Sequence, residues 1–374
     1  MTPDERRSLI LDGVSEVVGA EHLESCLATG RGIGGGPIKA YIGFEPSGHA
    51  HLGWLVLSQR MRRFLDADLH LTVLLADWHG WINDKLGGSL ESIEVASVHM
   101  ESVFRCLLDD PPEGDGPGQV SFVRASHLVD DGDYWAGVIR HMKNVSLARI
   151  RKTFSIMGRD EDDADGDTSK FLYPAMQSQD IHTMNIDVAL GGMDQRKAHM
   201  YMRDMADRLG LPKATCVHTP IIPGLRSATG RMDASITGGS GVQVAGADEK
   251  MSKSDPKGAI LLHHGAGRIR KLMRGAHLDP ASPDSPIHEI LEHIVFVRST
   301  SMPVDRSEEH GGPLTIESVD QARRLLADGD LHPLDYKESV AARIADLLAP
   351  LRSRIESEPA TFQALDRLVQ KHSA

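Results

Sequence analysis

The chain has 374 residues, of which 40% are hydrophobic and 25% charged, and its formal net charge is −12. This length favours two domains, and the negative charge argues against nonspecific nucleic-acid binding, because phosphates are held mainly by lysine and arginine. The longest strongly apolar run, residues 71–76, is too short to cross a bilayer, and the N-terminus lacks the apolar core of a signal peptide. We therefore expect a cytoplasmic protein.

The first two thirds of the chain alternate short β-rich runs with segments of helical periodicity. This alternation predicts an α/β fold, in which crossover helices connect the strands of a parallel sheet. Helices are expected from Trp54 onward and over residues 194–209, the latter ending before Gly210. The candidate strands are residues 40–44, 69–76, 120–123, 186–190 and 215–218.

Several stretches have the composition of loops, namely residues 30–37, 111–118 and 159–167. The longest is 226–249, which is rich in glycine, alanine and serine and poorly suited to form a core. From about residue 282 a proline-rich stretch gives way to helical segments at 319–326 and 336–348. These segments predict a second, largely helical domain.

The three cysteines, Cys26, Cys106 and Cys216, are far apart and odd in number. This usage fits a reducing compartment and argues against a cysteine-rich zinc site, so we interpret them as small core residues. A zinc site built on His49 and His51 would lack a convincing third ligand nearby.

Residues 41–53 predict a strand, a tight Gly/Pro turn and the start of a helix. The unpaired N–H groups and the dipole at such a helix start suit a phosphate, and His51 adds a donor beside them. In the alternative interpretation, His51 only caps the helix.

Lys250 and Lys253 lie in the string Lys-Met-Ser-Lys-Ser, which a solvated loop can also produce by chance. Lysine is a flexible point charge that can reach phosphates. If Lys250, Lys253 and His51 meet the charge that develops as pyrophosphate leaves, catalysis of attack on an α-phosphate is mainly electrostatic.

Tyr173, Gln177 and Asp180 recur at helical spacing after Pro174, so one helix face carries three polar groups. An exposed polar face is one interpretation. Apolar neighbours such as Phe171 favour a small-ligand pocket instead. The segment 191–195 follows a strand and opens a helix, which adds two polar side chains, Asp194 and Gln195.

Together these residues resemble the class I tyrosyl-tRNA synthetases of the archaeal and eukaryotic-type branch. The resemblance runs from about Tyr41 to Asp335. Its strongest matches are Tyr-Ile-Gly-Phe-Glu-Pro-Ser-Gly at 41–48, Leu-Leu-Ala-Asp-Trp-His at 74–79, Tyr173-Pro174 with Gln177 and Asp180-Ile181-His182, Gly-Gly-Met-Asp-Gln-Arg-Lys at 191–197, and the lysine string.

The resemblance implies a Rossmann-type parallel-sheet catalytic domain followed by a mainly helical C-terminal anticodon-binding domain, in a homodimer. The implied boundaries are an N-terminal helical extension over 1–38, a catalytic domain over 39–281 with the insertion 226–249, and the anticodon-binding domain over 282–374. The implied reaction converts L-tyrosine and ATP, the latter with Mg²⁺, to tyrosyl-adenylate and pyrophosphate. The tyrosyl group then passes to the 3′-terminal adenosine of tRNA(Tyr), and no permanently bound metal or organic cofactor is implied.

The resemblance also implies roles for individual residues. Tyr41 and Asp180 would bind the phenol hydroxyl of tyrosine, and its ammonium group would be held by Tyr173, Gln177 and Gln195. The ATP site would comprise Gly43, His51, Gly53, Asp194 and Lys253, and the catalytic residues would be His51, Lys250 and Lys253. Acceptor-stem contacts are implied for Lys152, Arg196 and Lys197, and anticodon contacts for His310, His332 and Asp335.

Two departures from the family pattern and two competing functions accompany this interpretation. Trp54 stands where the second histidine of the His-x-Gly-His motif is expected, and the insertion 226–249 is longer than in archaeal members. The competing functions are a tryptophanyl-tRNA synthetase and a non-charging paralogue that binds RNA or a small molecule. Tyr41 with Asp180 favours a phenol over an indole, while Lys250 and His51 favour catalysis.

Overall fold

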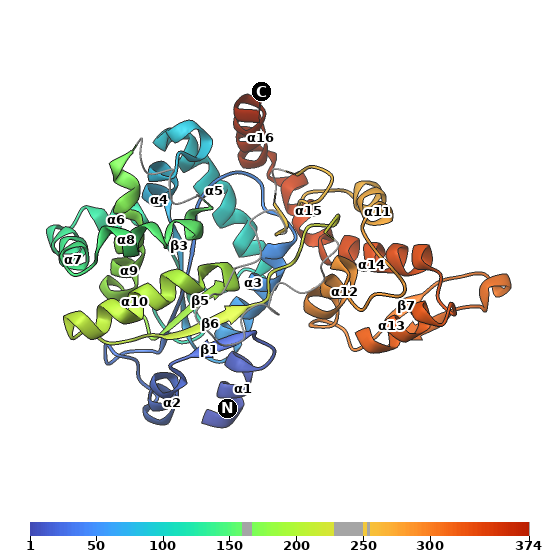
Figure 1. Cartoon of the computed structure of the whole chain (residues 1–374), viewed down its shortest axis with the longest axis horizontal. Coiled ribbons are helices and arrows are strands. Elements are labelled where there is room, and N and C mark those ends of the chain that lie inside the picture. The colour runs from blue at the N-terminus through green and yellow to red at the C-terminus, as the bar shows by residue number, and fades with distance from the viewer. Residues whose placement is uncertain (159–166, 228–249, 253–254, 374) are drawn as a thin grey trace. The chain divides into compact units, whose positions relative to one another are not determined.

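The computed structural model describes residues 1–158, 167–227, 250–252 and 255–373. These residues form two compact units (Figure 1). The first comprises residues 1–48, 60–219 and 360–374, and the second comprises residues 49–59 and 220–359. The division differs from the predicted boundaries at 39–281 and 282–374, since residues 220–281 cluster with the helices that follow them.

A six-stranded sheet forms the centre of the first unit, in the order β1-β6-β5-β2-β3-β4. All neighbouring strands are parallel except β1, which runs antiparallel to β6. The predicted α/β fold is therefore confirmed, and each predicted strand lies within two residues of an observed one. The strands are β1 (Glu16–Val18), β2 (Lys39–Phe44), β3 (His70–Leu75), β4 (Val120–Arg124), β5 (Val188–Gly192) and β6 (Thr215–Thr219).

The strand order reverses between β2 and β5. From β2 the chain continues outward through β3 and β4, and it then returns to add β5 and β6 on the other side. Tyr41 of β2 pairs with Ala189 of β5 across this junction. Ligands of open parallel sheets bind at the carboxyl ends of the strands beside such a reversal, so Phe44 and Gly192 mark the expected site.

Helices surround this sheet, and α9 packs against both α7 and α10. Local signals explain several of their ends: the Ser89 side chain accepts from the N–H of Ser92 at the start of α5, and Gly210 ends α10 with a φ of 65°. The helices are α1 (Pro3–Leu11), α2 (Ala20–Thr29), α3 (Gly53–Asp66), α4 (Asp77–Ile82), α5 (Leu90–Leu107), α6 (Ala125–Val129), α7 (Gly132–Lys143), α8 (Leu147–Arg151), α9 (Tyr173–Thr183), α10 (Arg196–Leu209) and α16 (Pro359–Ser373). Short 3₁₀ turns are η1 (Lys85–Gly88), η2 (Phe154–Met157), η4 (Thr168–Phe171) and η5 (Met193–Gln195). The division between the two units falls within α3.

Two details of the first unit differ from the sequence expectations. The N-terminal extension is not purely helical, because Glu16 to Val18 form the edge strand β1. A strand of three residues is too short for its alternation to stand out. The basic residues between Arg140 and Lys152, whose sequence alone suggests a single helix, belong to two helices, because α7 ends at Lys143 and α8 begins after the cap Ser146, whose side chain accepts from the N–H of Arg149.

The C-terminal helix α16 belongs to the first unit, although its residues follow the helices of the second. Leu365 of α16 is fully buried against Leu86 and Ala96, and Val369 packs beside them. This apolar contact explains why residues 360–373 cluster with the sheet.

The second unit is mainly helical, as predicted, but it also contains an antiparallel pair of short strands, β7 and β8. Strands of three residues again escaped prediction. Its elements are α11 (Ala266–Arg274), α12 (Pro286–Ile290), η6 (Leu291–Val295), β7 (Met302–Val304), η7 (Glu308–His310), β8 (Leu314–Ile316), α13 (Val319–Ala327), α14 (Pro333–Leu347) and α15 (Ala349–Ser357).

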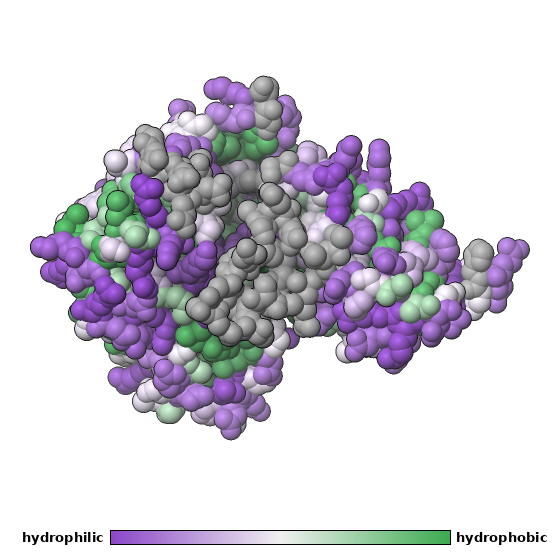
Figure 2. All heavy atoms as spheres, in the orientation of Figure 1, coloured by the Kyte–Doolittle hydropathy of each residue, from purple (hydrophilic) through white to green (hydrophobic). Residues whose placement is uncertain are grey.

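The described surface shown in Figure 2 is mostly hydrophilic, with apolar residues in separate patches. In the part of the chain that the structure describes, no helix is long and apolar enough to cross a membrane.

One cysteine lies in a group with metal-ligand chemistry, formed by His22, Cys26 and Asp187. Asp187 accepts hydrogen bonds from the backbone N–H groups of Ile33 and Lys39 at 2.8 and 2.9 Å, and the Cys26 thiol donates to it at 3.6 Å. Burial and the charge of Asp187 raise the pKa of Cys26 to about 12. Because the thiol stays protonated and the carboxylate already has donors, we interpret this group as a structural hydrogen-bond network.

Two stacked histidines, His141 of α7 and His182 of α9, lie inside the first unit. Their ring centroids are 5.6 Å apart. Burial lowers the pKa of both side chains to about 4, and the charge of His182 contributes to the shift of His141. Since unfolding restores a pKa near 6.5, the unfolded state binds more protons below that pH.

We therefore predict that stability is complete well above pH 6.5 and falls as the pH drops from 6.5 to 4, by up to about 3 kcal/mol for each histidine. Thermal melting as a function of pH measures this loss. His141→Asn should flatten the dependence, whereas the same change at the exposed His127 should leave it intact. A slope unaltered by His141→Asn would assign the acid sensitivity to other groups.

Candidate functional site

The predicted face of α9 lies inside the first unit rather than in solvent. Asp180 is 0% exposed and Tyr173 is 6% exposed, which excludes an exposed polar face. Around Asp180 gather Tyr41 from β2, His79 from α4 and Tyr134 from α7, and we call these residues with Tyr173 the Asp180 cluster. The sheet and three helices thus contribute to one buried group.

The Asp180 carboxylate has different neighbours on its two oxygens. The Tyr134 hydroxyl donates to Oδ1 at 2.8 Å. Nε2 of His79 lies 3.1 Å from Oδ2, which is ion-pair distance, but the two atoms are not aligned as a hydrogen bond. Among the described residues, Oδ2 has no hydrogen-bond partner although it is buried. An orphaned buried acceptor of this kind is typical of a site that receives a donor from a ligand.

Gly43 gives the Tyr41 side chain its space. The two residues lie two positions apart on β2, so both point to the same face of the sheet. A Cβ atom on Gly43 would lie 2.5 Å from the Tyr41 hydroxyl oxygen and 3.2 Å from Cζ. The sequence analysis related Gly43 to the nucleotide, and the structure gives it this further contact with Tyr41.

Glu45, which follows β2, connects three of the surrounding elements. It accepts from the Tyr173 hydroxyl at 2.5 Å and from the Asn83 amide at 3.0 and 3.1 Å. The Lys85 ammonium lies 3.5 Å from its Oε2. Glu45 thereby orients Tyr173 at the carboxyl end of β2.

Gln177 and Gln195 come together as the sequence predicted. The Gln177 amide donates to Oε1 of Gln195 at 3.1 Å. The other amide atom, Oε1 of Gln177, is buried and has no hydrogen-bond partner within the described part of the chain. It is a second orphaned acceptor on α9, three residues before Asp180.

Electrostatics keep the tyrosines of the cluster protonated. Burial, followed by the charge of Asp180, raises the pKa of Tyr41 and of Tyr134 above the ordinary range. Burial and the charge of Glu45 do the same for the pKa of Tyr173. Burial alone would lower the pKa of His79, yet the carboxylates of Asp180, Glu45 and Asp77 together raise it. The cluster therefore presents neutral hydroxyl donors and a histidine with cationic character to one carboxylate.

His51 and Gly53, predicted to start a phosphate-binding helix, lie in the second unit. The backbone of His51 forms an isolated β-bridge with Leu261. The Nδ1 atom of His51 accepts from the N–H of Gly53 at 3.2 Å, so the side chain caps the start of α3. A Cβ on Gly53 would lie 2.9 Å from the His51 ring, which explains the need for glycine here. Capping through Nδ1 orients the ring and leaves the phosphate interpretation of His51 open.

Lys250 lies in the same unit as His51. It forms an isolated bridge with Pro223, and the next residue, Met251, is 1% exposed and donates its N–H to Ile222 at 3.0 Å. These contacts anchor the beginning of the lysine string. Lys253 and most of the insertion 226–249 lie outside the described residues.

The residues predicted to contact the adenylate ribose and the tRNA acceptor stem have varied surroundings. Asp194 lies in η5 beside the end of β5, while Lys152 is exposed after α8. Arg196 donates through Nε to both oxygens of Glu16, at 3.0 and 2.8 Å. Lys197 donates to the Ser155 hydroxyl at 3.0 Å. Arg196 is thus paired with an acid on β1, a contact that the sequence did not indicate.

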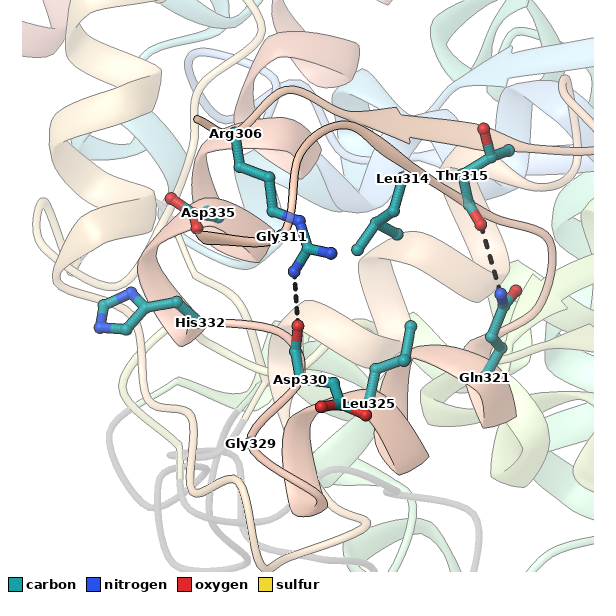
Figure 3. A pocket seen from close by; sticks show the side chains of 10 residues that line it. All are labelled: Arg306, Gly311, Leu314, Thr315, Gln321, Leu325, Gly329, Asp330, His332 and Asp335. Atoms are coloured by element: carbon teal, nitrogen blue, oxygen red, sulfur yellow. Dashed lines mark hydrogen bonds between the residues drawn. The ribbon is translucent and has the colours of Figure 1, made fainter. Parts of the chain in front are cut away.

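A pocket of about 630 Å³ opens in the second unit, and two of the other predicted tRNA residues, His332 and Asp335, line it (Figure 3). His332 caps α14, accepting from the N–H of Leu334 at 3.2 Å, and Asp335 lies in the first turn of that helix. Arg306 donates to the backbone carbonyls of Gly312 and Asp330. The side chain of His310 lies outside the described part of the structure. The lining residues are Arg306, Gly311, Leu314, Thr315, Gln321, Leu325, Gly329, Asp330, His332 and Asp335.

Sequence reasoning missed Tyr134, His79 and Glu45 as members of the site. Glu45 and His79 lie within two of the family motifs, at 41–48 and 74–79, so the sequence already indicated that these residues belong to the site, although not which contacts they make. Tyr134 lies on a helix outside every motif, and its contact with Asp180 depends on tertiary packing alone.

Comparison with known proteins agrees with this geometry. The family model for class I tRNA synthetases of the tryptophan and tyrosine type matches residues 35–349. Tyrosine–tRNA ligase of Saccharolobus solfataricus is 36% identical over 100% of this chain and 97% of its own length, and that of Aeropyrum pernix is 40% identical over 98% of both.

The solved structures give the same result. Tyrosyl-tRNA synthetase from Pyrococcus horikoshii, complexed with L-tyrosine, superposes with a TM-score of 0.84 and 34% identity, covering 98% of this chain and 100% of that one. The Aeropyrum pernix enzyme superposes with a TM-score of 0.80 and 36% identity, covering 98% and 99%. The chain, which is similar to these archaeal enzymes over its full length, belongs to the class I tyrosyl-tRNA synthetases, the tyrosine–tRNA ligases.

Proposed function

We propose that the Asp180 cluster binds the phenol hydroxyl of L-tyrosine and that this contact selects the amino acid. The observation that supports it is the buried Oδ2 of Asp180, which lacks a hydrogen-bond partner among the residues described. A substrate hydroxyl would donate to this oxygen, with the Tyr41 hydroxyl beside it. Phenylalanine would leave this buried oxygen without a hydrogen-bond donor, and tyrosyl-tRNA synthetases are themselves the standard example of such rejection, at about 10⁵-fold.

The second orphaned acceptor suits the other end of the amino acid. Oε1 of Gln177 is buried and unpartnered in the described structure, and an ammonium group offers the donors that it needs. Gln195, which is bound to Gln177, and Tyr173, which is held by Glu45, complete the proposed ammonium site.

For ATP we propose that His51, Lys250 and Lys253 stabilise the charge on the phosphates as pyrophosphate leaves. The N–H groups at the start of α3 suit the same anion. Gly43, Gly53 and Asp194 are proposed for the adenosine part. Mg²⁺ would enter with ATP and neutralise phosphate charge, and the tyrosine carboxylate would attack the α-phosphate to give tyrosyl-adenylate.

In the second step the tyrosyl group would pass to the 3′-terminal adenosine of tRNA(Tyr). We propose that Lys152, Arg196 and Lys197 contact the acceptor stem. The 630 Å³ pocket would take the first anticodon base, with the Asp335 carboxylate as acceptor for a base N–H and His332 beside it. His310 remains the candidate for stacking, and a homodimer is proposed from the family.

The first test measures ATP–pyrophosphate exchange with each amino acid. We expect exchange with L-tyrosine, and Asp180→Ala should lower kcat/KM for tyrosine by at least a hundredfold with little change in the KM for ATP. Exchange driven by tryptophan and not tyrosine would support the other amino acid of this family. Equal effects of Asp180→Ala on tyrosine and ATP would make the residue structural.

The contact between Gly43 and Tyr41 predicts a steric variant. Gly43→Ala would push a methyl group against the Tyr41 hydroxyl, so we expect the KM for tyrosine to rise about tenfold. Gly132→Ala is the control, because a Cβ there meets no atom within 4 Å. Steady-state kinetics measure both variants, and an unchanged KM in Gly43→Ala would show that Tyr41 does not need this space.

The anticodon proposal predicts a variant that separates the two steps. Asp335→Ala should reduce kcat/KM for tRNA charging by about tenfold to a hundredfold while tyrosine-dependent exchange stays unchanged. The exposed Asp320 on α13 provides a control substitution in the same unit. Normal charging by Asp335→Ala would contradict the assignment.

A further inference from the structure

The hydroxyl of Tyr134 has a specific partner inside the first unit. Tyr134 lies on α7, is 1% exposed, and donates to Oδ1 of Asp180 at 2.8 Å. A phenol hydroxyl has a single proton. The shorter of its two contacts is with Oδ1, since the carbonyl oxygen of Met176 lies 3.4 Å away, so this proton is directed mainly to Asp180.

His79 constrains the other oxygen. It is 1% exposed, and its Nε2 lies 3.1 Å from Oδ2. The Tyr173 ring holds the imidazole edge-on, with centroids 5.0 Å apart and planes at 90°. The carboxylates around His79 raise its pKa despite burial, which favours the protonated ring beside Oδ2.

A fully buried carboxylate without such partners would turn toward another donor. The orientation matters for substrate choice, because Oδ2 accepts from a substrate hydroxyl only when it faces the substrate. Whatever keeps Asp180 correctly turned thereby strengthens the discrimination between a phenol and a bare phenyl ring.

We propose that Tyr134, assisted by His79, is a positioning residue that holds Asp180 as an oriented acceptor and so determines the preference for tyrosine over phenylalanine. The inference rests on the proposed role of Asp180 in binding the phenol hydroxyl. It gives a function in specificity to a residue of α7, which lies outside the motifs of the sequence. Loss of one hydrogen bond to a buried charged group corresponds to roughly a tenfold to hundredfold effect.

The test compares activation of tyrosine and phenylalanine by the full chain in ATP–pyrophosphate exchange. In Tyr134→Phe we expect kcat/KM for tyrosine to fall about tenfold to a hundredfold, with that for phenylalanine unchanged or raised, so that the ratio falls by at least that factor. A purely structural role would lower both values together and leave the ratio intact.

Tyr201→Phe is a matched control. Tyr201 of α10 is 2% exposed, and within the described residues its hydroxyl has no hydrogen-bond partner. Its loss should leave the ratio unchanged. His79→Gln provides a second variant, which removes the cationic neighbour of Oδ2 and should lower the ratio in the same direction. Thermal melting establishes that each variant folds.

The outcomes separate this inference from the proposed function. If wild type prefers tyrosine and Asp180→Ala abolishes that preference while Tyr134→Phe and His79→Gln keep it, the positioning role is wrong and the role of Asp180 stands. If wild type does not prefer tyrosine, the proposed function itself fails.

Discussion

The burial of one carboxylate, that of Asp180, is the constraint on which the arrangement of the first unit depends. Moving an ionised carboxylate out of water costs several kcal/mol unless donors replace the lost hydration. Here the replacements come from different elements: Tyr134 on α7 donates to it, and His79 on α4 lies at ion-pair distance. The positions of α4, α7 and α9 are therefore coupled, because a shift of any one of these helices would lengthen a contact that replaces the lost hydration of the carboxylate.

The apolar packing around these helices supports the same geometry. One hydrophobic cluster buries Tyr134, Phe154 and Met176. In the same cluster the ring centroids of Phe154 and Phe171 lie 5.3 Å apart. Such close packing resists small displacements, because even a methyl-sized gap forfeits contacts. The apolar neighbours thus hold the side chains of the Asp180 cluster in fixed positions, although they take no part in binding. Glycine contributes in the opposite sense, since Gly43 and Gly53 leave the space that Tyr41 and His51 occupy.

The sequence predicted the elements that show a regular hydrophobic pattern. It did not predict the elements whose placement depends on a few tertiary contacts. Strands of five or six residues were found within two residues of their ends, because burial gives them long apolar runs. β1, β7 and β8 have three residues each, too few for any period to show. The return of α16 to the first unit depends on contacts such as those of Leu365 and Val369 with Leu86 and Ala96, and no local pattern encodes its destination.

The site shows the same division. Tyr173, Gln177 and Asp180 were predicted together because a helix fixes their common face. Tyr134 was not, since its contact with Asp180 spans 46 residues and two helices. The pairing of Arg196 with Glu16, 180 residues away, escaped prediction for the same reason. Spacing encodes neighbours on one element, whereas partners on different elements follow only from the packed fold.

The ion pair between Arg196 and Glu16 affects the proposed contact of Arg196 with tRNA. The Glu16 carboxylate is shared, because Nδ1 of His218 lies 2.9 Å from the oxygen that Arg196 also contacts at 2.8 Å. A phosphate that draws Arg196 must compete with this acid. Since the chain also carries a net charge of −12, its general attraction for RNA is weak. If Asp335 reads an anticodon base as proposed, selection would come from that contact. Weak general attraction combined with such a contact would let tRNAs with the wrong anticodon dissociate quickly, as a ligase that chooses one tRNA among many requires.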